Sequence, residues 1–207
     1  GKCCGCACRH CPYHHENVAL SKRQAGSIST PTILCGSFAA LASAHRSTSA
    51  DAAQEVGDGI DVLFWSGGKD SYLAARALCR DRQGSKSQLL LLTTFDAASR
   101  QVAHQEVNIS EVCRQAQSLG LPLVGVPMFP YFSYNDRIAD AFQYIADELT
   151  KVTQKLPLLS PSLKVGRVCN GDLHLESVRG WREVNIGPLA ERILGARLHA
   201  PLWRGSF

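Results

Sequence analysis

One short segment sets the architecture of this chain: Ile60-Asp61-Val62-Leu63-Phe64-Trp65, followed directly by Ser66-Gly67-Gly68-Lys69-Asp70-Ser71. The first half is a short apolar run that stops at two glycines, which is typical of a buried strand. The second half leads into residues 71–80, where apolar side chains recur at helical spacing. The segment therefore predicts a strand, a tight glycine loop and a helix in immediate succession.

The rest of the chain repeats this alternation. Buried strands are expected at 89–93, 123–126 and 165–169, and helices are expected after caps at Ser110 and Asn135 and from Pro188. Alternating strands and helices predict an α/β fold, an open parallel sheet with helices on both faces and a Rossmann-like architecture. Ligands of such sheets bind beyond the carboxyl ends of the strands. The loop that follows the first strand is therefore the first place to expect a site.

Composition divides the 207 residues into a Cys/His-rich motif at 1–16, a Ser/Ala-rich linker at 17–58 and an α/β domain at 59–207. From Asn17 to Ala50 there is no acidic residue, and little apolar periodicity is present to offset the entropy of ordering. Within the expected linker, 33–41 is apolar enough for one weak helix. The cysteines number nine, an odd count, and five of them fall within Cys3 to Cys11, which favours a cytoplasmic protein over a secreted disulfide scaffold.

Charge and hydropathy limit the kinds of partner. The net charge is +4 without a block of five Lys or Arg, so a nucleic-acid partner is not favoured. No run of about 18 apolar residues occurs, and we expect no membrane span. The chain begins with Gly rather than Met, so we expect a fragment or a processed form.

The glycine loop has the chemistry of a pyrophosphate site. Two glycines let the backbone approach a ligand closely, and the amides they free form a donor nest at the positive end of the next helix. Lys69 adds a positive charge. Asp70 either helps to hold Mg²⁺ or caps the helix. The spacing differs from that of the Walker loop.

Family resemblance narrows the expected chemistry. The loop resembles the signature of the PP-loop ATP pyrophosphatases, or adenine nucleotide α-hydrolase-like proteins, which implies cleavage of ATP to AMP and pyrophosphate. Over about Ile60 to Trp203, the chain is similar to the diphthine–ammonia ligase (diphthamide synthetase) family and its bacterial relatives of unassigned substrate. The similar stretches are Leu91-Leu92-Thr93-Thr94-Phe95-Asp96, Val102-Ala103-His104-Gln105, Gln115-Ala116, Leu119-Gly120-Leu121-Pro122-Leu123, Asn170-Gly171-Asp172-Leu173-His174-Leu175-Glu176, Arg179, Trp181-Arg182-Glu183 and Pro201-Leu202-Trp203.

The resemblance implies an amide synthesis in which ATP adenylates the carboxylate of diphthine, a modified His on elongation factor 2, and ammonia then displaces AMP. The catalytic residues it suggests are Lys69, Asp70, His104 and Asp172. The residues expected to hold ATP are Ser66, Gly67, Gly68, Lys69, Asp70, Ser71 and Gly171.

Several roles stay open at this point. His104 either donates to the α-phosphate or is a loop residue bonded to backbone. Asp172 either binds Mg²⁺ or ammonia, or forms a turn or helix cap. Glu176, Arg179 and Glu183 have the spacing of a surface ion-pair ladder, and Trp203 either packs or stacks on adenine. The family continues past Pro-Leu-Trp into a Gly-Glu-rich region, so we expect this chain to lack that substrate region.

The cysteine cluster has metal-ligand spacing. Cys8 and Cys11 are separated by the two-residue gap used by Zn²⁺ and Fe–S ligands, and a second pair is available from Cys3, Cys4 and Cys6, with Cys3 and Cys4 as the expected ligands. A metal site at these four residues and a tail with free thiols both fit the pattern. The stretch also resembles a small uncharacterised Cys-rich domain.

Two other functions compete with the ligase. A PP-loop sulfur transferase that modifies tRNA would use a Cys cluster, and a nucleotide-binding pseudoenzyme would keep the loop without the reaction.

Overall fold

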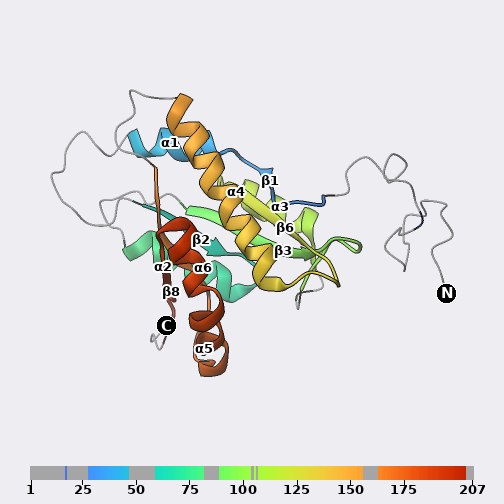
Figure 1. The fold of residues 1–207 in the computed structure, drawn as a ribbon. Coiled ribbons are helices and arrows are strands. Elements are labelled where there is room, and N and C mark those ends of the chain that lie inside the picture. Colours follow the sequence, from blue (N-terminus) through green and yellow to red (C-terminus); the bar gives the residue numbers. More distant parts are fainter. Residues whose placement is uncertain are drawn as a thin grey trace.

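The computed structural model describes residues 17, 28–46, 59–81, 89–103, 105, 107–155 and 163–203. In these ranges the strands form one sheet in the order β1-β6-β3-β2-β7-β8, and β4 and β5 extend it beside β3 (Figure 1). The strands are β1 Thr32–Cys35, β2 Ile60–Phe64, β3 Leu89–Asp96, β4 Gln101–Val102, β5 Val107–Asn108, β6 Leu123–Met128, β7 Val165–Cys169 and β8 Arg197–His199. The helices are α1 Phe38–Arg46, α2 Lys69–Asp81, α3 Ile109–Leu119, α4 Tyr134–Lys155, α5 Glu176–Asn185 and α6 Gly187–Leu194.

The sheet is mostly parallel and confirms the expected α/β class. β2 pairs in parallel with β3 on one side and with β7 on the other, and β6 and β8 extend the two sides. The expectation of a purely parallel sheet is wrong, because β1 pairs antiparallel with β6 and β4 pairs antiparallel with β3. From β2 the chain builds outward to β3 and β6, and then returns across β2 to add β7 and β8.

Part of the expected linker belongs to the sheet domain. The amide of Ile33 in β1 donates to the hydroxyl of Tyr144 at 3.1 Å, and the buried Arg137 donates to the carbonyl of Ser29 at 3.0 Å. Phe38 and Leu41 of α1 are buried beside α4. The linker interpretation is therefore wrong for 28–46. It failed because this short segment packs on β6, α3 and α4, which lie far along the chain.

The weak helix expected at 33–41 is instead a strand and then a helix. Gly36 separates them with a positive φ of 73°, and a Cβ there would lie 2.7 Å from the Cα of Pro122. This close approach needs glycine and ends β1 before α1 can begin.

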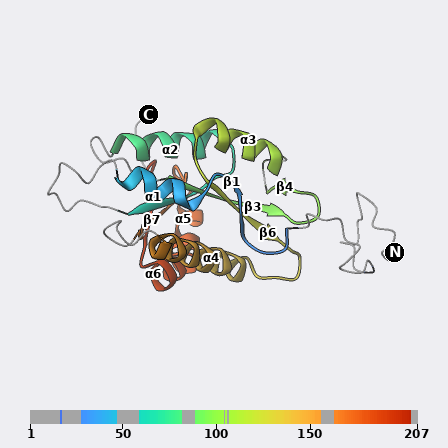
Figure 2. The ribbon, with the colours of Figure 1, turned by 90° about the horizontal axis from the view of Figure 1, so that it is seen from above.

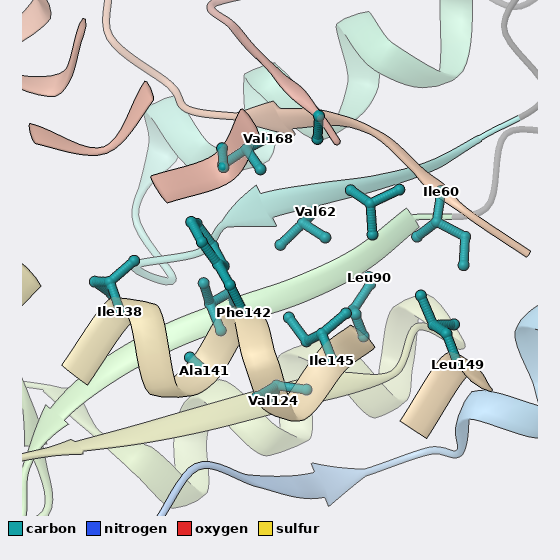
Figure 3. Close-up of a cluster of buried hydrophobic side chains, with 14 of the residues drawn as sticks. Ile60, Val62, Leu90, Val124, Ile138, Ala141, Phe142, Ile145, Leu149 and Val168 are labelled. Carbon is teal, nitrogen blue, oxygen red and sulfur yellow. The ribbon is translucent and has the colours of Figure 1, made fainter. Parts of the chain in front are cut away.

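The sheet separates two apolar layers (Figure 2): α2 and α3 cover one face, while α4 and α6 cover the other. Alternation along β2 divides its side chains between them, so Ile60 and Val62 join the α4 layer while Leu63 joins the α2 layer. Figure 3 shows the apolar stripe of α4, including Ile138, Phe142 and Ile145, lying on the strand side chains. This burial supplies most of the force that holds the sheet in place.

The caps expected at Ser110 and Asn135 are not the observed ones. Asn108, not Ser110, caps α3 by accepting from the amide of Ser110 at 3.0 Å. α4 already begins at Tyr134, so Asn135 lies inside the helix rather than capping it. Gly120 and Gly195 end α3 and α6 with left-handed backbone angles, which glycine adopts without strain. In the part of the chain that the structure describes, no helix combines the length and apolarity needed to cross a membrane.

Candidate functional site

The glycine loop and the Gly171 turn meet at one point of the sheet. β2 ends at Phe64 and leads into the glycine loop, and the neighbouring β7 ends at Cys169 and leads into Asn170-Gly171-Asp172. Strand order reverses between these two strands, and such a reversal is where open α/β sheets hold their ligands. The structure therefore brings together the two segments that the sequence singled out separately.

The loop is a compact turn with its polar groups already oriented. Gly67 has a positive φ of 79°. The amide of Gly68 donates to the hydroxyl of Ser66 at 3.3 Å, and the hydroxyl of Ser71 donates to the carbonyl of Gly68 at 2.8 Å. α2 begins at Lys69, and the amides of a first helical turn have no partner inside the helix. The amides of this turn lie at the positive end of α2, while the hydroxyl of Ser71 is engaged with the carbonyl of Gly68.

Lys69 and Asp70 differ in exposure. The side chain of Lys69 is 84% exposed, and its Nζ lies 3.7 Å from Oδ1 of Asp70, which is an ionic contact longer than a hydrogen bond. That same Oδ1 atom is buried and accepts no hydrogen bond from the described residues. A buried carboxylate oxygen without a donor is costly, so it fits a cation.

Mg²⁺ suits this carboxylate because the ion needs one or two protein carboxylates, with phosphates and waters filling its other positions. The described ranges contain no group of three or more His, Cys, Asp or Glu side chains arranged as a metal cage. The fit is thus to an ion that arrives with a phosphate ligand, held by Asp70.

The carboxylate of Asp172 forms an ion pair with the guanidinium of Arg182. Nε of Arg182 in α5 donates to Oδ2 of Asp172 at 2.8 Å, and both side chains are largely buried. The turn before Asp172 is formed by Asn170, whose side chain accepts from the amide of Asp172 at 3.3 Å. The guanidinium of Arg182 also lies 5.4 Å from the centre of the Phe64 ring. Arg182 is therefore a residue of this site to which sequence reasoning assigned no role, although Trp181-Arg182-Glu183 is part of the family resemblance.

Tyr134 completes this side of the site. Burial raises the pKa of its hydroxyl, and the nearby Arg182 lowers that pKa by a smaller amount, so the group stays protonated at neutral pH. Its ring meets the ring of Trp181 edge-on, with centres 5.7 Å apart. The start of α4 and the middle of α5 thus form an aromatic wall beside the Asp172–Arg182 pair.

Gln115 is a second residue whose role the sequence did not show. From α3, its Nε2 donates to the carbonyl of Gly67 at 3.3 Å, and its Oε1 accepts from the indole of Trp65 at 3.2 Å. Gln115-Ala116 was part of the family resemblance, which was the available signal, but it gave no role. The side chain of Gln105 lies over the same loop, since a Cβ on Gly68 would be 3.0 Å from its Oε1.

The remaining candidates fall outside this cluster. Arg179 pairs with Glu183 at 2.7 Å on the surface of α5, as the ladder interpretation expects, and its guanidinium lies 4.6 Å from the centre of the Trp203 ring. His104 lies outside the described residues, as do the expected metal ligands Cys3, Cys4, Cys8 and Cys11.

Comparison with known proteins adds no assignment: no protein-family model and no curated protein matches this chain.

Proposed function

We propose that this chain is an ATP-binding enzyme of the PP-loop type, which splits ATP between the α- and β-phosphates. More particularly, we propose a ligase of the diphthine–ammonia ligase kind, which adenylates a carboxylate and passes it to ammonia. Diphthine on elongation factor 2, or a related carboxylate, would be the acceptor. The single observation that carries the proposal is the contact between the glycine loop and the Gly171 turn where the strand order reverses.

The loop supports binding of a triphosphate tail. The amides of the first turn of α2 would donate to phosphate oxygens, and Lys69 is exposed enough to reach their charge. The hydroxyls of Ser66 and Ser71 would join them by turning away from their present acceptors, the Ser71 hydroxyl and the Gly68 carbonyl. Asp70 would hold Mg²⁺ through its Oδ1, which accepts no hydrogen bond from the described residues. When bound, the ion neutralises charge on the phosphates.

The opposite wall supports binding of the acceptor. Arg182 uses its Nε for Asp172, and guanidinium has four further N–H donors, one of which can serve Tyr134. We propose that the others orient the acceptor carboxylate toward the α-phosphate. A carboxylate oxygen then attacks the α-phosphorus and pyrophosphate leaves. Ammonia next attacks the acyl carbon, AMP leaves with the carboxyl oxygen, and one proton is released.

The test follows all three products. ATP labelled at the α-phosphate is incubated with the chain, ammonium and elongation factor 2 carrying diphthine, and labelled AMP, pyrophosphate and the amide are measured. Lys69→Ala is expected to lower AMP formation by about 10²-fold, as for other lost charge-stabilising groups. Lys155→Ala, an exposed lysine at the end of α4, is the matched control and should leave the rate unchanged.

The outcomes separate the alternatives. ATP binding without AMP formation with any acceptor would indicate a nucleotide-binding module. Release of ADP and phosphate would contradict the proposed bond cleavage. Thiolated tRNA as the product would point to a sulfur transferase.

A further inference from the structure

We propose that Gln115 is a positioning residue that fixes the orientation of the Gly67–Gly68 peptide plane in the nucleotide loop. This inference rests on the proposed nucleotide function and concerns how the conformation of the loop is held.

The two ends of the Gln115 carboxamide have distinct partners. The indole N–H of Trp65 can only donate, so the atom that faces it at 3.2 Å must be the carbonyl oxygen of Gln115. This leaves the NH₂ group to face the carbonyl of Gly67 at 3.3 Å. Trp65 is buried at 4% exposure, and its donor would be unsatisfied without Gln115. Trp65 therefore orients Gln115, and Gln115 in turn orients Gly67.

The peptide plane between Gly67 and Gly68 needs such a partner. Both residues lack Cβ, so the plane can rotate between turn forms that differ in the direction of this peptide. In the observed form the carbonyl of Gly67 points to α3, and the amide of Gly68 points the other way, to the hydroxyl of Ser66 at 3.3 Å. The flipped form would replace that donor with a carbonyl oxygen, which repels phosphate.

α3 is a rigid support for this contact. Val112 and Ala116, which flank Gln115 in the helix, are fully buried in the α2 layer. Gly67 lies close against the helix, because a Cβ on it would be 2.8 Å from Oε1 of Gln115 and 3.3 Å from a methyl of Val112. The loop therefore takes its shape from α3, and not only from its own sequence.

Two substitutions separate the contact from charge effects. Gln115→Glu keeps the shape and the acceptor for Trp65 but replaces the donor to Gly67 with an oxygen. We expect ATP, in a calorimetric titration of the whole chain, to bind about tenfold more weakly or worse. Gln115→Met removes the donor without adding charge, and we expect ATP to bind more weakly to this variant as well. Gln117→Glu is the matched control: it lies on the same helix, is exposed and should leave affinity unchanged.

A second readout does not depend on nucleotide. The ¹⁵N–¹H resonance of Gly68 in the free protein reports its amide partner, and it should shift in Gln115→Glu and in Gln115→Met but not in Gln117→Glu. If the wild-type chain fails to bind ATP, the proposed function fails, whereas the Gly68 resonance still decides the role of Gln115. An unchanged Gly68 resonance in both Gln115 variants would overturn the inference, as would wild-type ATP affinity in both.

Discussion

Gly171 lies directly against the first turn of α2: a Cβ on Gly171 would come within 2.9 Å of the carbonyl carbon and oxygen of Asp70. The amide nitrogen of Ser71 would be 3.1 Å away. These are backbone atoms that cannot rotate aside, so no side chain fits at this position. The segment after β7 and the start of α2 therefore pack backbone to backbone, at a distance that leaves no room for a Cβ at Gly171.

We predict that Gly171→Ala destabilises the chain by about 1 to 3 kcal/mol, the usual range for overpacking. Moving α2 away from β7 also displaces the loop amides, so ATP affinity should fall by about tenfold or more. Urea unfolding and calorimetric titration measure the two effects.

Gly180→Ala is the control for this substitution. Gly180 lies inside α5, and a Cβ on it would have no heavy atom within 4 Å. Alanine is the better helix former, so stability should rise by about 0.5 to 1 kcal/mol. Equal losses of stability in the two variants would contradict the steric argument for Gly171.

Arg182→Met should destabilise the chain by about 2 kcal/mol, because it leaves the largely buried Asp172 without its charged hydrogen-bond donor. Arg114→Met removes an exposed i,i+3 pair with Glu111 and should cost less than about 1 kcal/mol. Both are measured by urea unfolding. A double variant with Asp172→Asn should be less destabilised than the sum of the two single changes, and simple additivity would argue against the pair.

Breaking the buried ion pair of Arg167 and Asp61 should lower stability by more than breaking the pair of Arg182 and Asp172. Arg167 contacts both carboxylate oxygens of the fully buried Asp61, at 2.9 and 2.7 Å. Arg167→Met should destabilise the chain by about 3 to 5 kcal/mol, because Asp61 loses this bidentate partner in the core. Asp61→Leu combined with Arg167→Met should restore much of that loss in chemical unfolding. A double variant as unstable as the sum of the single variants would contradict this account.

His199 should make stability depend on pH. Its Nε2 is buried without a hydrogen-bond partner among the described residues, and burial followed by repulsion from Arg167 lowers its pKa below 6.5. The unfolded chain therefore takes up a proton near pH 6.5 while the folded chain does so only at lower pH. Stability is lost as pH falls below about 6.5 and levels off below the folded pKa.

Urea midpoints at about pH 7.5 and about pH 5 test this with His199→Gln, which does not titrate there. The wild-type chain should lose more stability between the two pH values than the variant does. Equal losses would show that His199 does not titrate differently on folding.

Sequence patterns located much of this molecule. The apolar run from Ile60 and the two glycines after it predicted β2, the loop and α2, and the run at Val165–Cys169 predicted β7 with its observed bounds. Such elements can be predicted because their signals are local, namely side-chain periodicity and the backbone freedom of glycine. By contrast, composition predicted a linker over 28–46, and no local pattern predicted α5 or β8 as a complete element.

By itself, the sequence determined the order of strands and helices around the glycine loop. Each of these elements follows from the side-chain pattern of a short continuous segment. Only the tertiary structure decided that β1 joins the sheet, that Arg182 pairs with Asp172, and that Gln115 supports Gly67. Each of these contacts joins residues from separate elements. Their formation depends on how the elements pack, which no local pattern of residues records.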